Sequence, residues 1–481
     1  MIRIYLDWNI ISNLKKPENV QIMDFIKIHK EHLLFLYSPA HFADLMKSDR
    51  ARPEFQKDLE MLQYLCGKHH IRWENDQFIG LFRYPNQYYD EIKDNEMDET
   101  SFDLEKQFQI LEELSDDDPV AKVLIDNYKK SLQSTKFDLL LDETSSKVFE
   151  AFFPNQDPNA SLWDLSKAFG LSAQAIINNK QIWLDLRKYI DESGGKLESN
   201  AGNWDKNEVI IKVGDFLKKI SPTPLSFYEY IQINYKDREK PATLYELYQS
   251  AYLTLDLMGY KSDSLPKQTD SMLNITTDID HSFLAQACDI FVLEDKKMKA
   301  KTEALYHYFN ISTKVINLSD FVGSCSELIF ENEINTPESI VNGFFKKNGE
   351  QLKELVCGNI SPFNKKLQKR LINFFDFVHF EYNEENNLIC FTFSKDEFKY
   401  ARFLYYTEKE YLISELERFF EHSDQSEDYK IQKADFITKS EFYPFIFNQS
   451  SVHGMLWKDD KYNLPLLTMF VPFYINGGKN L

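Results

Sequence analysis

The stretch IYLDWNIISNL, residues 4–14, decides the fold expected for the N-terminal part of the chain. A partly β-branched apolar run ends in Asp7, which predicts a carboxylate directly after a buried strand. Open α/β sheets bind their ligands at the carboxyl ends of such strands. Asn9 and Ser12 follow on the turn and the first helical residues. Because an Asp in this position also serves as a helix cap, Asp7 needs partners from elsewhere in the chain to indicate a functional site.

A second strand-to-helix segment, FLYSPAHFADLMKSD, covers residues 35–49. Its strand ends at Ser38-Pro39, and proline is favourable in the first turn of a helix. His41 and Asp44 are three residues apart, so their side chains project from one face of that helix. A histidine near a helix start is often only a hydrogen-bonded residue of the partial core. The shared face nevertheless makes both residues candidates for a site.

A third segment, TTDIDHSFLAQACDIFVLEDKKMKAK, covers residues 276–301. It predicts a helix that begins near His281, with Asp280 in the cap or first turn, and a strand that ends in Glu294-Asp295. Capping again explains an aspartate at a helix start, because it accepts hydrogen bonds from free N–H groups and suits the helix dipole. Asp278, two residues earlier, is a second candidate, and the sequence does not decide which of the two points inward.

Four short apolar runs, each followed by helix-compatible sequence, indicate an α/β fold with a largely parallel central sheet. They are Arg3–Leu6, Leu33–Tyr37, Ile290–Leu293 and Lys314–Ile316. Because two runs lie near the start of the chain and two lie after residue 275, we expect one domain split by an insertion. Such a sheet would bring four carboxylates to one edge. Four like charges within a few ångströms repel strongly without a cation, so the cluster implies a hard divalent metal ion bound through oxygen.

These residues, taken in order, resemble a PIN-like metal-dependent ribonuclease domain, and most of all the large bacterial PIN-like proteins with a helical insertion. The resemblance rests on Asp7-x-Asn9, Ser38-Pro39-x-His41-x-x-Asp44, the Asp280 helix with its small residues Ala285 and Ala287, and the strand end Phe291-Val292-Leu293-Glu294-Asp295. It covers about residues 1–50 and 270–320 and says nothing about the rest of the chain. It implies a three-layer PIN-like fold that binds Mg²⁺ or Mn²⁺ and cuts single-stranded RNA.

Matched position by position, the resemblance implies four catalytic metal ligands, namely Asp7, Asp44, Asp280 and Asp295. Asn9 and His41 would orient water or phosphate, and Lys296 and Lys297 would suit a polyanionic substrate. The chemistry would be metal-assisted hydrolysis of phosphodiester bonds, without a side-chain nucleophile. Two departures concern the ligands: Asp44 is shorter than the Glu often found there, and Leu293 replaces the usual Thr or Ser.

The chain contains 56 Lys and Arg against 76 Asp and Glu, a net charge of −20, which argues against a dedicated duplex-DNA binder. Any nucleic-acid contact must therefore be local. A further basic set lies toward the C-terminus and comprises Lys346, Lys347, Lys353, Lys365, Lys366, Lys369 and Arg370, although charged faces usually serve only solvation. The five cysteines are widely spaced, which indicates neither disulfides nor a thiolate metal site. No stretch approaches ~18 uncharged apolar residues, and we expect a cytoplasmic protein without a membrane partner.

Changes in composition divide the chain into four parts. We expect the first half of the PIN-like domain at 1–75, a helical insertion at 76–250, the second half at 251–330 and a C-terminal α+β module at 331–481. The insertion includes a strongly acidic segment at 91–119. By family analogy alone, insertion and module suggest a regulated stress, toxin or antiphage effector with a protein regulator or self-association.

Two other functions compete with a nuclease. A strand-end Asp also opens the haloacid-dehalogenase phosphatase motif, but that motif needs an acid/base Asp where this chain has Asn9, and an amide cannot carry the proton. The second is a catalytically inactive PIN-like scaffold that binds proteins through the acidic insertion. An intact cluster of buried carboxylates argues against the scaffold, because it would cost stability without a function.

Overall fold

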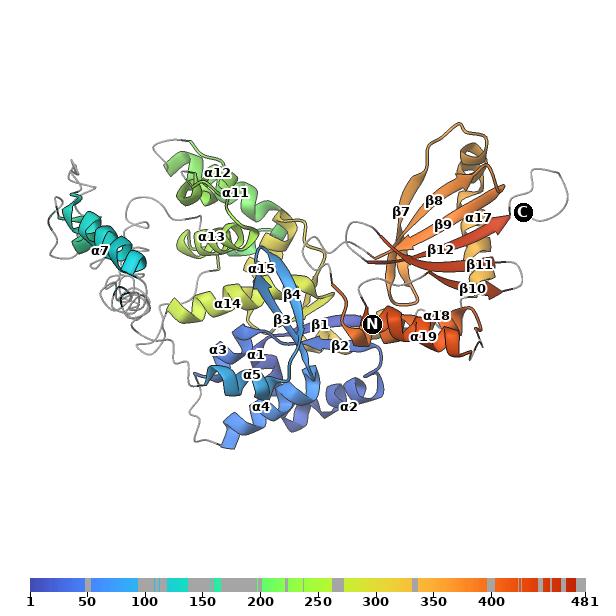
Figure 1. The fold of residues 1–481 in the computed structure, drawn as a ribbon, viewed down its shortest axis with the longest axis horizontal. Coiled ribbons are helices and arrows are strands. Elements are labelled where there is room, and N and C mark those ends of the chain that lie inside the picture. Colours follow the sequence, from blue (N-terminus) through green and yellow to red (C-terminus); the bar gives the residue numbers. More distant parts are fainter. Residues whose placement is uncertain are drawn as a thin grey trace. The chain divides into compact units, whose positions relative to one another are not determined.

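The computed structural model describes residues 1–47, 53–93, 119–136, 161–165, 201–220, 224–236, 238–261, 272–330, 336–395, 403–422, 427–439, 444–449, 452–459 and 464–472, with a few isolated positions between them. The chain divides into two compact units, and Figure 1 labels many of their elements. Unit 1 comprises Met1–Asn86, Arg238–Tyr248 and Asp280–Leu481. Unit 2 comprises Gln87–Asp237 and Gln249–Ile279.

A four-stranded parallel sheet forms the centre of the N-terminal part of unit 1. Its order is β2-β1-β5-β6, with β1 at Ile2–Leu6, β2 at Leu33–Leu36, β5 at Ile290–Val292 and β6 at Lys314–Ile316. All residues of β1, β2 and β5 are buried, as expected for strands covered on both faces. The four strands predicted from the sequence, and their union in one parallel sheet, are therefore confirmed.

The strand order of this sheet reverses at the end of β1. The helices α1 (Trp8–Leu14) and α2 (Val20–Ile28) lead from β1 to β2, and the chain later returns to β5 on the other side of β1. The carboxyl ends of β1 and β5 therefore flank the point at which the strand order reverses, where open α/β sheets form their binding crevice. The helices α3 (Pro39–Leu45) and α15 (Lys296–Tyr308) follow β2 and β5, respectively.

A β-hairpin corrects the predicted start of the helical insertion. The strands β3 (His69–Glu74) and β4 (Gln77–Phe82) are antiparallel and joined by Asn75 and Asp76, which both have positive φ. Asn and Asp tolerate this conformation, which two-residue hairpin turns require. Residues 76–86 thus belong to unit 1 and not to an all-helical segment.

Helices make up the described regular structure of unit 2. They include α7 (Pro119–Ser134), α11 (Lys206–Ile220) and α12 (Phe227–Ile231), together with parts of α5 (Pro85–Ile92), α13 (Leu244–Leu257) and α14 (Met272–Leu284). The helix expected in PVAKVLIDNYKKSL is confirmed as α7. The helix expected in FDLEKQFQILEEL and most of the acidic segment 91–119 lie outside the described residues.

The C-terminal part of unit 1 is an antiparallel sheet with helices, in agreement with the α+β composition of 331–481. Its six strands run in the order β10-β11-β12-β9-β8-β7. They are β7 (Phe363–Leu371), β8 (Phe375–Asn383), β9 (Leu388–Ser394), β10 (Phe445–Gln449), β11 (Val452–Lys458) and β12 (Pro465–Pro472). Its helices are α17 (Pro337–Val356), α18 (Tyr406–Phe419) and α19 (Glu427–Thr438). Helix α16 (Phe321–Phe330) precedes this part of the chain.

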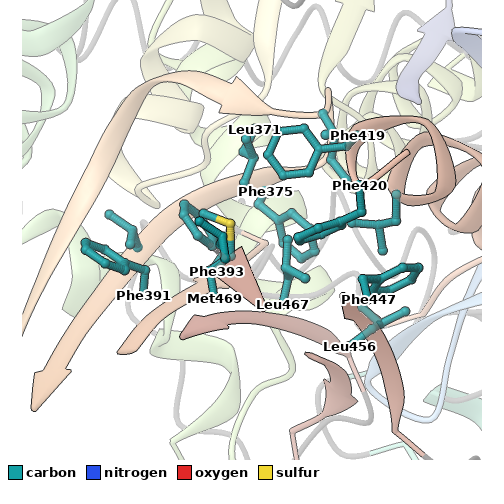
Figure 2. Close-up of a cluster of buried hydrophobic side chains, with 14 of the residues drawn as sticks. Leu371, Phe375, Phe391, Phe393, Phe419, Phe420, Phe447, Leu456, Leu467 and Met469 are labelled. Atoms are coloured by element: carbon teal, nitrogen blue, oxygen red, sulfur yellow. The ribbon is translucent and has the colours of Figure 1, made fainter. Parts of the chain in front are cut away.

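An aromatic core holds this sheet and its helices together, as Figure 2 shows. Phe375, Phe393 and Leu467 from three strands are fully buried within it. From the end of α18, Phe420 stacks on Phe447 of β10, with ring centroids 5.1 Å apart. The high phenylalanine content of the chain, 39 residues, is therefore used in part to build a second core.

Buried ion pairs join the C-terminal module to the amino-terminal end of β1. Arg3 donates two hydrogen bonds to Glu408 of α18, at 2.8 and 2.7 Å, and both side chains are at most 1% exposed. Arg370 of β7 binds Asp289, which directly precedes β5, at 2.7 Å. In Figure 1 the N-terminus accordingly lies beside α18. The module at 331–481 thus belongs to the same unit as the parallel sheet.

Candidate metal centre

Asp7 lies at the end of β1 and is almost completely buried. Its backbone N–H still donates to Val292 of the neighbouring strand β5 at 2.9 Å, and its side chain is 4% exposed. Asp7 occupies the N-cap position of α1, but its carboxylate makes no capping hydrogen bond. Capping, the structural explanation considered from the sequence, therefore does not account for this aspartate.

Three side chains from three elements converge beside the end of β1. Asp7, Asp44 of α3 and His281 of α14 each offer one ligand atom, and these atoms lie within 4.8 Å of one another. His281 Nε2 is 3.0 Å from Asp44 Oδ2. Two carboxylate oxygens and one imidazole nitrogen form a donor set that divalent metal ions accept in proteins. The structure thus brings together two of the four predicted ligands and adds a histidine.

The start of α3 explains the position of Asp44. Ser38 is the N-cap, Pro39 follows at the first helical position, and His41 completes a capping box with Ser38. Asp44 then lies one turn further along the helix, half-buried, where its second oxygen accepts a hydrogen bond from Lys47 at 2.6 Å. Asp44 therefore contacts one imidazole and one ammonium group.

His41, which was predicted to orient water or phosphate, instead uses both of its ring nitrogens in hydrogen bonds to the backbone. His41 is fully buried, and its Nε2 donates to the carbonyl of Leu6 at 2.9 Å. Its Nδ1 accepts from the backbone N–H of Ser38 at 3.0 Å. Both ring nitrogens therefore bind the protein's own backbone, and burial lowers the pKa of His41 to about 3, so the ring is neutral.

The pKa values of the two neighbouring carboxyl groups are shifted in opposite directions. Burial raises the pKa of Asp7, and the negative charge of Asp44 raises it further. Burial also acts to raise the pKa of Asp44, but His281 and Lys47 outweigh it and lower that pKa to about 2. Of the two, Asp7 is thus the carboxylate whose charge the fold disfavours. A cation beside it would remove this cost.

Asp280 does not lie at a helix start, which corrects the predicted boundary near His281. Helix α14 begins at Met272, so Asp278 lies at its midpoint and Asp280 and His281 lie in its second half. Ile279 and Phe283, four residues apart and fully buried, form the apolar face that continues through this region. The aspartates suggested a cap, but this apolar spacing was the better guide to the helix.

Asp280 and His281 face different partners because neighbouring helical residues differ by about 100° in direction. Asp280 accepts a hydrogen bond from the Tyr245 hydroxyl at 2.6 Å, and burial raises the pKa of Asp280. Asp278 is half-buried, and it lies one helical turn before His281. Among the residues that the structure describes, the group within 4.8 Å contains neither aspartate.

Asp295 and the residues after it have structural contacts of their own. Asp295 is exposed and caps α15, accepting hydrogen bonds from the backbone N–H groups of Lys297 and Met298 at 2.7 and 2.8 Å. Lys296 is exposed and Lys297 half-buried at the start of this helix, so both are accessible. Asn9 is exposed and donates to Asp7 Oδ2 at 3.3 Å. The structure therefore shows Asp295 as a cap.

The basic set of the C-terminal module is only partly accessible. Arg370 is paired with Asp289 and Asp376, at 2.7 and 2.6 Å, which removes it from the predicted anion-binding residues. Lys365 donates to Gln351 at 2.7 Å and also binds Asn348. Lys365 and Arg370 lie on β7, the last strand in the sheet order. Lysines on such an edge strand discourage pairing with another sheet.

No family model, curated protein or solved structure matches this chain. The described helices include none that is both long and apolar enough to cross a bilayer. All five cysteines are free thiols, as predicted.

His281 is the candidate ligand that sequence reasoning missed. The segment TTDIDHSF drew attention to its aspartates, whereas the useful signal was the spacing of Thr277 and His281, two polar residues four apart. Both are buried in the structure, with 5% and 0% exposure. Polar side chains at a helical interval on a buried face require partners, and imidazole is a common metal ligand.

We expect His281→Ala to weaken Mn²⁺ binding far more than Asp280→Asn does. The first substitution removes a donor atom from the converging group, and the second changes a carboxylate that binds Tyr245. Loss of a metal ligand should cost at least ~10-fold in affinity, as losses in the outer shell already cost 10–100-fold. Isothermal titration of both variants with Mn²⁺ measures this. The opposite ranking would show that Asp280 holds the ion.

Proposed function

We propose that this protein is a PIN-like, metal-dependent endoribonuclease that hydrolyses phosphodiester bonds in single-stranded RNA. The observation that supports it is the convergence of Asp7, Asp44 and His281 at the strand-order reversal of a parallel sheet. Two arguments support this proposal. One is the sequence resemblance, and the other is that open α/β sheets bind their ligands at this position.

The residues present fit a divalent ion. Asp7 is buried, carries no capping role and has a raised pKa, so its charge needs a positive partner. Asp7, Asp44 and His281 would hold the ion, and Asn9 would help to orient Asp7 through the hydrogen bond to Oδ2. A divalent ion held there would activate water and offset the charge that develops on the leaving oxygen.

We assign substrate binding to lysine side chains near the same edge of the sheet. Lys296 and Lys297 follow the end of β5, the strand next to β1. In a chain with a net charge of −20, such a local pair is where a phosphate group would be attracted. Further along the same helix, Lys299 donates to Asn317 at 2.8 Å, and Lys301 is buried.

A metal-free scaffold is the second candidate, and one observation favours it. Asp44 already contacts His281 and Lys47, so a positively charged imidazole would by itself stabilise the cluster. The two functions differ in a simple assay of the full chain. A nuclease cuts a fluorescent single-stranded RNA with Mn²⁺ and stops with EDTA, whereas a scaffold leaves the RNA intact under both conditions.

We expect the protein to prefer Mn²⁺ over Mg²⁺ by at least ~10-fold in affinity, because Mg²⁺ strongly prefers oxygen ligands and His281 supplies nitrogen. Isothermal titration of the full chain with each ion measures the ratio. His281→Asp serves as the matched variant, since an all-carboxylate site should narrow the ratio. Equal affinities in the native chain would argue against a nitrogen ligand.

A further inference from the structure

A chain of hydrogen bonds leads from His281 back to the backbone of β1. Tyr5 Oη lies 2.9 Å from His281 Nδ1 and 2.5 Å from Ser38 Oγ. Ser38 Oγ lies 3.2 Å from His41 Nδ1, and His41 Nε2 lies 2.9 Å from the Leu6 carbonyl. All four side chains of this relay, namely Tyr5, Ser38, His41 and His281, have no solvent exposure. Their hydrogen bonds must therefore be satisfied within the protein.

The backbone determines the protonation of His41. A carbonyl only accepts and a backbone N–H only donates, so Nε2 carries the hydrogen toward Leu6, and Nδ1 accepts from the N–H of Ser38. The ring is neutral, because one of its nitrogens donates and the other accepts. The far end of the relay is therefore a hydrogen-bond acceptor.

This acceptor gives the relay a direction. His41 Nδ1 can accept from the N–H and the hydroxyl of Ser38 together, in a shared three-centre hydrogen bond, and the Tyr5 hydroxyl can then donate to Ser38 Oγ. The Tyr5 hydroxyl uses its one hydrogen in this bond. The Tyr5 oxygen is then left to accept a hydrogen bond, and its remaining partner at short distance is His281 Nδ1.

We propose that Tyr5, Ser38 and His41 are positioning residues that keep the hydrogen of His281 on Nδ1, which leaves Nε2 to bind the divalent ion together with Asp44 and Asp7. This inference rests on the metal site of the proposed function. It agrees with the general behaviour of metal-binding histidines, whose second ring nitrogen donates to a fixed acceptor. Here that acceptor is a buried phenol oxygen.

The arrangement also explains why the site requires a cation. With the hydrogen on Nδ1, the lone pair of Nε2 faces Asp44 Oδ2 across 3.0 Å. Two acceptors at this distance repel each other unless a proton or a metal ion lies between them. The relay therefore prepares His281 for a positive ligand.

The first test is the affinity of Tyr5→Phe for Mn²⁺, measured by titration of the full chain. The change removes the hydroxyl and keeps the ring, which packs on Phe291. We expect a 10–100-fold weaker affinity, as found when outer partners of metal ligands are removed. Ser38→Ala should have a smaller effect, because Tyr5 then still lies 3.4 Å from His41 Nδ1.

Tyr37→Phe is the matched control. Tyr37 is equally buried, but its hydroxyl donates to the Arg83 carbonyl, outside the relay. It should lower the melting temperature about as much as Tyr5→Phe without weakening Mn²⁺ binding. Equal losses of affinity in both tyrosine variants would reduce the role of Tyr5 to packing and overturn the proposal.

The second test reads the position of the hydrogen directly in the native chain, so it does not depend on a variant that folds. Nitrogen-15 NMR of histidine-labelled protein distinguishes the two tautomers, and His281→Asn assigns the signal. We expect Nδ1 of His281 to carry the hydrogen when diamagnetic Zn²⁺ is bound. A hydrogen on Nε2 in the Zn²⁺-loaded protein would overturn the relay. If Mn²⁺ binds as described but RNA is not cut, the proposed function fails and this inference stands.

Discussion

Asp7→Asn is expected to abolish divalent-dependent cleavage of single-stranded RNA, with a loss of at least ~10²-fold in rate. The substitution removes the negative charge of Asp7, which lies where the strand order reverses, at nearly constant volume. Without this charge the site loses several kcal/mol of metal-dependent stabilisation of the transition state. Cleavage of a fluorescent RNA with Mn²⁺ measures the effect. Asp24→Asn, an exposed aspartate on α2, is the control with the same chemical change.

The same substitution should raise thermal stability in the absence of metal, although it abolishes cleavage. In metal-free buffer Asp7→Asn should melt at a higher temperature than the native chain, because burial and Asp44 disfavour the charge of Asp7. Added Mn²⁺ should then stabilise the native chain and not the variant, since only binding to the folded state raises stability. Full cleavage activity in Asp7→Asn would remove this site from the mechanism.

Glu408→Gln should destabilise unit 1 by ~3–5 kcal/mol. Glu408 accepts two hydrogen bonds from Arg3, both side chains are buried, and the change leaves the guanidinium without its counter-charge. Urea unfolding followed by circular dichroism measures the loss. Glu410→Gln, an exposed residue on the same helix, is the control and should change stability by less than ~0.5 kcal/mol.

This ion pair also predicts loss of stability in acid. The pKa of Glu408 is lowered in the folded protein: burial opposes the shift, but Arg3 outweighs it. A carboxyl group with a lowered folded pKa contributes stability above its unfolded value of about 4.3 and loses it as the pH falls through the folded value. The native chain should therefore lose more stability than Glu408→Gln below about pH 4. If the free energies of unfolding of the two proteins fell equally with decreasing pH, the ion pair would contribute little to stability.

Several features of this protein were accessible from local sequence. Short apolar runs flanked by polar residues predicted β1, β2, β5 and β6, because strands buried on both faces must be continuously apolar. The position of Asp7 at a strand end followed from the same pattern. Helix α3 and the shared face of His41 and Asp44 followed from Ser38-Pro39 and a spacing of three.

Tertiary structure decided which chemically similar residues share a site. Asp280 and Asp295 have the same side chain as Asp7, yet one binds Tyr245 and the other caps α15. An aspartate at a strand or helix end suits a cap and a ligand equally well in local sequence. The direction of each side chain around α14 then selected His281. That helix begins at Met272, nine residues before the start predicted from the aspartates.

Long-range pairing was likewise invisible in the sequence. Nothing near Arg3 indicates that Glu408 will be its partner, because the pair forms only when α18 packs at the start of β1. The sequence by itself determined the α/β class, the four parallel strands and a carboxylate at the end of the first one, since these depend on local hydrophobic pattern. The tertiary structure alone decided the ligand set and the buried charge partners, since these depend on which distant surfaces exclude water from one another.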